Sequence, residues 1–226
     1  MHLKCRGLPR RSLTDYYVNF RAGTEPSEPI LPGPTWDSVP GVRIVGGDLR
    51  GRVLRAPSGA ATRPTSEKVR EALFNILGAV AGDHVLDLFA GSGALGIEAL
   101  SRGAAHATFV DAARPAVIAI RGNLRELGLE DRATVVIGDA VASAARQPPA
   151  VPWRLVFVDP PYRSELATRA VLALPSERLA GDAVVVIEHD RRNAPPDALG
   201  SLLRTDQRRY GDTLISFFVR SREVPA

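Results

Sequence analysis

Among its 226 residues the chain has one cysteine, two lysines and only 6% aromatic residues, and it has no long apolar run. The one cysteine, Cys5, lies near the start of the chain, which excludes an internal disulfide framework and a cysteine-based metal cluster. No apolar stretch approaches the roughly 20 residues of a membrane-spanning helix, and the first residues lack the apolar segment of a secretory signal. We therefore expect a cytoplasmic protein that needs no metal and binds no membrane.

Lysine occurs only at Lys4 and Lys68, so arginine carries nearly all of the positive charge behind the formal net charge of +4. The arginine side chain is a planar fork that binds phosphate and stacks on bases, which favours a nucleic-acid partner. A GC-rich genome would also replace lysine by arginine without any such partner. Composition leaves both interpretations open.

The sequence divides into three predicted parts. Residues 1–40 form an irregular or disordered leader, because they show almost no apolar periodicity and prolines recur at Pro26, Pro29, Pro32, Pro34 and Pro40. Residues 41–62 contain two short alternating runs, 42–45 and 52–55, separated by a glycine-containing turn, which is typical of a β-hairpin. Residues 63–226 form the main domain. The leader is either a lineage-specific RNA-binding tail or a product of a misassigned translation start.

The main domain begins with a helix and continues with alternating strands and helices. Thr65 or Ser66 is expected to cap the first helix and Gly78 to end it, with one apolar face formed by Val69, Leu73, Ile76 and Leu77. Strands are expected at 84–88, 107–110, 134–137, 155–158 and 183–187, with helices at 94–102, 115–127, 141–146 and 165–174 between them. This alternation predicts a doubly wound α/β fold with a parallel sheet. The last two runs, 205–210 and 213–220, flank Gly211-Asp212 and predict an antiparallel final strand.

A glycine-rich loop follows the first strand of the sheet and opens a helix. Gly91, Gly93 and Gly96 fit the spacing G-x-G-x-x-G, and Asp111 stands about 20 residues further on, where an acid can accept ribose hydroxyls. The same pattern fits a nicotinamide or flavin dinucleotide and S-adenosylmethionine. Gly96 serves either cofactor contact or close packing of the helix on the sheet.

Three carboxylates favour S-adenosylmethionine over a dinucleotide. Asp87 precedes the glycine loop, where it would repel a pyrophosphate but could pair with the ammonium of a methionyl group. Asp139 follows the third strand, where it could accept a hydrogen bond from an adenine amine, although it could equally cap the next helix, as could Asp111. Asp159 begins a motif that a dinucleotide enzyme does not need.

That motif, Asp159-Pro160-Pro161-Tyr162, directly follows the buried run 155–158. An amine attached to a nucleobase is a poor nucleophile, because its lone pair is delocalised into the ring. The Asp159 carboxylate and the Pro160 carbonyl can accept its two N–H bonds and favour the pyramidal form that attacks an electrophile. Pro161 helps to fix the backbone, and Tyr162 supplies a stacking surface. Alternatively, the motif is only a turn that ends a strand.

With both motifs in place, the chain resembles the RsmD family of bacterial methyltransferases. The resemblance runs from about Arg43 to Val219. It rests on 43–47, on Arg63-Pro64-Thr65 with the helix at 69–77, on the two motifs above, and on Tyr210-Gly211-Asp212-Thr213.

The resemblance implies an enzyme that methylates the N2 amine of a guanine in 16S ribosomal RNA, within the small ribosomal subunit or an assembly intermediate. It also implies a seven-stranded, Rossmann-like methyltransferase sheet and an N-terminal hairpin that engages RNA. Expected cofactor-binding residues are Asp87, Gly91, Ser92, Gly93, Asp111 and Asp139, and expected catalytic residues are Asp159, Pro160, Pro161 and Tyr162. Candidate phosphate contacts are Arg43, Arg50, Arg52, Arg55 and Arg63, for which a solvated basic face is the alternative.

Three rival functions remain at the level of sequence. A DNA methyltransferase acting on adenine N6 or cytosine N4 would use the same motif on a flipped base, although the chain lacks a large target-recognition domain. An NAD-dependent oxidoreductase would use the glycine loop alone. A noncatalytic RNA-binding module would keep the fold without the chemistry. The sequence does not identify the guanine or distinguish free RNA from an assembled subunit, and it leaves the oligomeric state open, with a monomer as the default.

Overall fold

The computed structural model describes residues 41–57, 67–146, 151–161 and 165–220, all of which belong to one compact unit. Tyr162, Arg63 and the leader 1–40 lie outside the described residues, as do the predicted helix caps Thr65 and Ser66. Within the described ranges, no helix is both long enough and apolar enough to cross a membrane.

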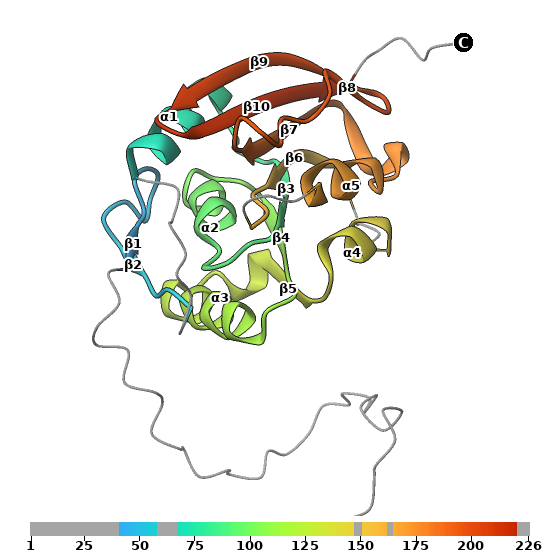
Figure 1. The fold of residues 1–226 in the computed structure, drawn as a ribbon. Helices are drawn as coiled ribbons and strands as arrows, with labels where there is room; N and C mark the ends of the chain where they lie inside the picture. The colour runs from blue at the N-terminus through green and yellow to red at the C-terminus, as the bar shows by residue number, and fades with distance from the viewer. Residues whose placement is uncertain (1–40, 58–66, 147–150, 162–164, 221–226) are drawn as a thin grey trace, which may run out of the picture. The chain divides into compact units, whose positions relative to one another are not determined.

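A mixed sheet forms the centre of the fold (Figure 1). Its strand order is β5-β4-β3-β6-β7-β10-β9-β8. The strands span β3 His84–Leu88, β4 His106–Asp111, β5 Ala133–Ile137, β6 Trp153–Val158, β7 Leu179–His189, β8 Ala198–Leu199, β9 Leu202–Tyr210 and β10 Thr213–Arg220. Neighbours from β5 to β7 pair in parallel, whereas β10 pairs antiparallel with both β7 and β9. The doubly wound sheet with an antiparallel last strand is confirmed, and the two-residue β8 adds an eighth strand to the seven expected.

Helices cover both faces of the sheet. They span α1 Glu67–Leu77, α2 Ala94–Ser101, α3 Arg114–Leu127, α4 Ala140–Arg146 and α5 Leu166–Leu172, and short 3-10 helices occupy Glu130–Arg132 and Ser176–Arg178. Helices α2 and α3 lie on one side of the sheet, and α4 and α5 lie on the other (Figure 1). This arrangement follows from right-handed crossovers between parallel strands whose order reverses at β3 and β6.

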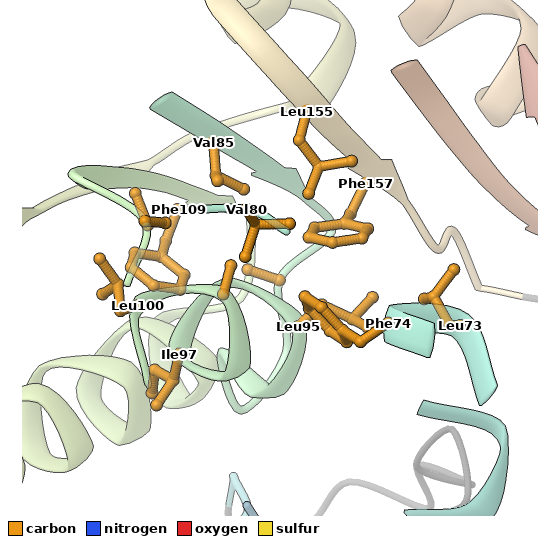
Figure 2. Close-up of a cluster of buried hydrophobic side chains, with 14 of the residues drawn as sticks. Leu73, Phe74, Val80, Val85, Leu95, Ile97, Leu100, Phe109, Leu155 and Phe157 are labelled. Atoms are coloured by element: carbon orange, nitrogen blue, oxygen red, sulfur yellow. The ribbon is translucent and has the colours of Figure 1, made fainter. Parts of the chain in front are cut away.

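Alternate residues of the central strands face two separate hydrophobic cores. Val85, Phe109 and Phe157 pack with α1, α2 and α3 in the first core, part of which Figure 2 shows, whereas Leu86 and Val156 pack with α4 and α5 in the second. Strands buried on both faces explain why these segments are apolar throughout. The site at the ends of the strands is therefore held by two packed layers.

Most predicted elements are confirmed to within a few residues, and Gly78 ends α1 with a φ of 71°. The predicted apolar face of α1 is partly wrong. Ile76 is 43% exposed, whereas Arg70 and Phe74 are 1% exposed. The ion pair of Arg70 with the buried Glu98, together with the apolar spacing, thus decides which side of α1 faces the rest of the fold.

The predicted N-terminal hairpin is present as β1 Val42–Arg43 and β2 Val53–Leu54, paired antiparallel. Glu98 of α2, which is fully buried, fixes it to the domain. The Glu98 carboxylate accepts the Val45 N–H at 2.9 Å and the Arg102 Nε–H at 2.8 Å, and it lies 3.5 Å from Arg70 Nε. Arg70 in turn donates to the Arg43 carbonyl. A buried ionic cluster therefore joins the hairpin, α1 and α2.

Candidate active site

Four adjacent parallel strands bring acidic residues to one edge of the sheet. Asp111 ends β4, Asp87 is the next-to-last residue of β3, Asp159 directly follows β6, and Glu188 is the next-to-last residue of β7. The register pairs Val158 with Leu88 on one side and with Ile187 on the other, so Asp159 and Glu188 occupy neighbouring positions on adjacent strands. The carboxyl edge of a parallel sheet at a change of strand order is the usual place for a ligand site.

The glycine loop between β3 and α2 has a backbone that most residues rarely adopt. Gly91 has a φ of 57° and Gly93 a φ of 79°. A Cβ at Gly91 would meet no described atom within 4 Å, so space is open beside the loop. Asp111 fixes the loop by accepting the Gly91 N–H at 2.8 Å through one oxygen and the Ala113 N–H at 2.8 Å through the other.

Asp87 is buried, with 1% of its surface exposed, and its Oδ2 accepts the Gly96 N–H at 3.0 Å. Burial raises the pKa of Asp87 to about 7, and the Asp111 charge adds to the rise, while the Gly96 hydrogen bond opposes it. The described charges that act on Asp87 thus include an acid and no cation. A buried carboxylate without an offsetting charge fits a cationic group of a ligand.

The geometry bears on three alternatives from the sequence. Gly96 serves helix–sheet packing, because a Cβ there would lie 2.3 Å from Phe109 Cε1. Asp139 caps α4 by accepting the Ala142 N–H at 2.8 Å, and its contact with adenine stays a prediction. Ala113, not Asp111, is the N-cap residue of α3.

Asp159 is the carboxylate with the most acidic surroundings. Its pKa is raised well above the ordinary value, first by burial and then by the charges of Glu188 and Asp87. Its backbone N–H is 3.5 Å from the Leu88 carbonyl, and within the described part of the chain its carboxylate accepts no hydrogen bond. Pro160 and Pro161 follow it at the surface, and the Tyr162 ring lies outside the described ranges. The Asp159 oxygens are therefore available to a donor on a ligand.

Sequence reasoning missed two residues of this region. Glu188 had a detectable signal, because it directly follows the predicted strand 183–187 beside the strand that leads to Asp159. Asn123 had none, since an asparagine within an amphipathic helix usually faces solvent. In the structure Asn123 is 2% exposed and contacts Ser92 of the glycine loop.

Arg43, Arg50, Arg52 and Arg55 are all exposed on or beside the hairpin, as predicted. Arg43 lies 3.9 Å from Glu67, and Arg55 pairs with Glu126 of α3 at 2.9 Å. Arg52 donates to the Glu126 carbonyl at 3.3 Å. Arg50 has no ion pair among the described residues. These contacts are weak at the surface and leave the arginines accessible to phosphates.

The site residues fit S-adenosylmethionine on chemical grounds. Asp111 uses one lone pair of each oxygen on the protein and retains others for ribose hydroxyls. Asp87 supplies an uncompensated buried anion for an ammonium group, and Gly91 leaves open space beside it. When bound, the cofactor would supply an electrophilic methyl group.

Sequence comparison gives matches over most of the chain. The model of the family described as Conserved hypothetical protein 95 matches residues 42–219. A Bacillus subtilis protein named "Putative rRNA methyltransferase YlbH" is 41% identical over 184 residues, which cover 78% of this chain and 98% of the relative. Ribosomal RNA small subunit methyltransferase D of Escherichia coli is 41% identical over 157 residues, which cover 69% of this chain and 78% of the relative.

Solved structures agree with these matches. A structure described as "Putative methyltransferase yhhF" from Escherichia coli is 36% identical, with a TM-score of 0.71, and the alignment covers 80% of this chain and 99% of that chain. A structure described as "Crystal structure of SMU.776, a putative methyltransferase complexed with SAH", where SAH is S-adenosylhomocysteine, is 17% identical. Its TM-score is 0.52 and the alignment covers 67% of this chain and 48% of that chain, which shows the fold alone.

The family match extends from the N-terminal hairpin to β10 and so includes every motif on which the resemblance rested. Two relatives at 41% identity match 78% and 69% of this chain and carry names of rRNA methyltransferases. The chain therefore belongs to the family described as Conserved hypothetical protein 95, the RsmD family that its sequence resembles.

Proposed function

We propose that this protein transfers a methyl group from S-adenosylmethionine to the exocyclic N2 amine of a guanine in 16S rRNA, acting on the small ribosomal subunit or its assembly intermediate in the cytoplasm. The observation that carries the proposal is the available Asp159 carboxylate beside the glycine loop, at one edge of the sheet. Family membership and the names of the relatives support the RNA substrate.

The cofactor would lie across the ends of β3 and β4. Asp111 would accept the ribose hydroxyls, and Asp87 would accept the methionyl ammonium. Gly91, Ser92 and Gly93 would allow close approach of the backbone. Asp139 would accept the adenine amine through the oxygen that does not cap α4.

The substrate amine would lie beside the end of β6. Asp159 and the Pro160 carbonyl would accept its two N–H bonds and direct the nitrogen lone pair toward the methyl group. One N–C bond forms as the S–C bond breaks, and a proton leaves the product amine for solvent. Pro161 would hold the loop rigid, and Tyr162 would stack on the base. Positioning of this kind supplies much of the rate enhancement in well-oriented reactions.

The hairpin would provide RNA affinity without reading sequence. Its arginines would contact phosphates beside an extruded guanine, together with Arg63 in the segment that precedes α1. The proposed division follows the prediction: residues 41–62 engage RNA, residues 63–226 bind the cofactor and catalyse transfer, and the leader 1–40 is dispensable.

The hydrogen bond from the first turn of α2 to Asp87 argues against a dinucleotide-dependent oxidoreductase. In a dinucleotide site, free N–H groups at this helix terminus bind the pyrophosphate. Here the Gly96 N–H is donated to Asp87 instead. A carboxylate at this position repels phosphate and attracts a cation.

Two measurements test the proposal. Calorimetry should show binding of SAH and no binding of NAD. Mass spectrometry of nucleosides from 16S rRNA, in cells with and without the protein, should show N2-methylguanosine only where the protein is present. Equal N2-methylguanosine in both samples would reject the proposed substrate.

A further inference from the structure

Asn123 joins two parts of the protein that the proposed function assigns to different ligands. It lies in α3 and is 2% exposed. Its Oδ1 accepts the Arg55 N–H at 2.8 Å, and its Nδ2 donates to the Arg55 carbonyl at 3.1 Å and to the Ser92 carbonyl at 3.0 Å. Arg55 directly follows the hairpin, and Ser92 lies at the centre of the glycine loop. One side chain thus bridges the hairpin and the cofactor loop.

The three bonds use one acceptor and both donors of the amide. Aspartate at this position would keep the acceptor but lose both donors, and it would place a negative charge against two carbonyl oxygens. Glutamine would displace the amide by one methylene group. All three partners are backbone groups, so the three bonds depend on where the backbone lies and not on which side chains Arg55 and Ser92 carry.

Further contacts make the hairpin and α3 one unit. Glu126, one turn after Asn123, accepts one hydrogen bond from Arg52 through its carbonyl and pairs with Arg55 through its carboxylate. The Arg70–Glu98 cluster also fixes the hairpin, but it contacts α1 and α2 and not the loop. Among the described contacts, Asn123 is therefore the one that transmits the position of the hairpin to Ser92.

We propose that Asn123 is a positioning residue that couples RNA binding at the hairpin to cofactor binding at the glycine loop. This inference rests on the proposed function. RNA held by the hairpin fixes Arg55, and Asn123 then holds the Ser92 carbonyl so that the loop keeps the form that the cofactor binds. Because coupling free energies are reciprocal, each ligand strengthens the binding of the other.

The test measures SAH affinity by equilibrium dialysis, with and without saturating purified small ribosomal subunits. For the unchanged protein, subunits should tighten SAH binding by on the order of tenfold. Asn123→Ala should weaken SAH binding about tenfold without subunits, as expected for unsatisfied buried backbone groups, and it should abolish the tightening. Asn123→Asp, which has nearly the same volume, should behave in the same way. Circular dichroism checks that each variant is folded at the temperature used.

Glu126→Gln is the matched control, because it removes the ion pair with Arg55 and leaves the Asn123 bonds intact. It should retain both the SAH affinity and the tightening by subunits. Folded Asn123 variants that behave like the unchanged protein would overturn the inference, as would the absence of any effect of subunits on SAH binding. Failure of the unchanged protein to bind SAH at all would instead reject the proposed function.

Discussion

At the scale of single residues, Asp87 and Asp159 favour the protonated form in the empty protein, whereas their proposed roles with ligands need the ionised form. Burial raises the pKa of Asp87 to about 7. Asp159 has a raised pKa because Glu188 and Asp87 add their charges to the effect of burial. A cationic cofactor beside these groups would stabilise their ionised forms. Acidic groups with raised pKa values and no cation among the described charges that act on them therefore indicate where a ligand would bind.

Asp87→Asn should change the pH dependence of the stability of the unliganded protein. The folded state holds the Asp87 proton up to about pH 7, whereas the unfolded chain releases it near 3.8, so this group lowers the free energy of unfolding as pH rises from about 4 to 7. Asparagine keeps the oxygen that accepts the Gly96 N–H and removes this decline. The variant should thus become more stable than the unchanged protein as pH rises toward 7, measured by urea unfolding from pH 5 to 8.

The same substitution should weaken cofactor binding. For the unchanged protein, SAH affinity should rise with pH toward 7 by up to about tenfold per pH unit, because Asp87 must lose its proton to pair with the ammonium. The variant should bind SAH weakly and without this slope. Equal slopes in both proteins would remove Asp87 from the ammonium site.

Asp159→Ala should leave SAH affinity nearly intact and lower turnover by about two to three orders of magnitude, as for the loss of one preorganised polar partner. The single-turnover rate of the unchanged protein should rise with pH as Asp159 ionises, at a pH above the ordinary range of an aspartate. Asp131→Ala, an exposed acid in the 3-10 helix Glu130–Arg132, is the control and should change neither quantity. A near-normal single-turnover rate for Asp159→Ala would refute the amine-positioning role.

At the scale of elements, helix α2 connects the hairpin, the glycine loop and the sheet. Gly96 in its N-terminal turn donates its N–H to Asp87 and packs on Phe109, and Glu98 holds the hairpin through the Val45 N–H. One helix of eight residues therefore contacts Asp87 before the glycine loop, the sheet and the N-terminal hairpin.

Gly96→Ala should destabilise the protein by about 1–3 kcal/mol, because the new methyl group would overlap the Phe109 ring. Adding Phe109→Leu should restore part of the loss. Gly122→Ala on α3 is the matched control, since its Cβ would meet no described atom within 4 Å, and it should be neutral or stabilising by up to about 1 kcal/mol. Thermal unfolding of the four proteins gives the comparison, and equal effects of the two alanines would contradict the packing role.

Glu98→Gln should lower the free energy of unfolding by about 3–5 kcal/mol, because it leaves the buried Arg70 charge without its partner. Glu67→Gln removes an exposed carboxylate 3.9 Å from Arg43 and should change stability by less than about 1 kcal/mol. Urea unfolding measures both. Similar values for the two variants would show that the buried cluster does not secure the hairpin.

Elements with strong local signals were predictable from the sequence, and long-range polar contacts were not. The strand at 84–88 and the final strand at 213–220 have the predicted bounds, since apolar patterns and turn residues are local. The burial of Arg70 on α1 was not predicted, because its partner Glu98 is 28 residues away. The contacts of Asn123 were not predictable either, because its partners are backbone groups on two distant segments.

At the scale of the whole molecule, the order of the parallel strands assembles the site. Asp87, Asp111 and Asp159 are far apart in sequence, yet each reaches the carboxyl edge because β3, β4 and β6 are neighbours in the sheet. The three aspartates at this edge were predictable from motifs, whereas Glu188 was missed and the proximity of these acids depends on the strand order that the structure gives. The placement of the Tyr162 ring and of Arg63 remains a prediction, because both lie outside the described residues.

The most direct measurement of the central claim uses a cofactor with a labelled methyl group. The protein is incubated with this cofactor and with small subunits, large subunits or duplex DNA, and the label is then identified after digestion to nucleosides. Our account predicts N2-methylguanosine from the small subunits alone, formed about two to three orders of magnitude more slowly with Asp159→Ala. Label that appears as N6-methyladenine in DNA, with none in small-subunit RNA, would contradict it.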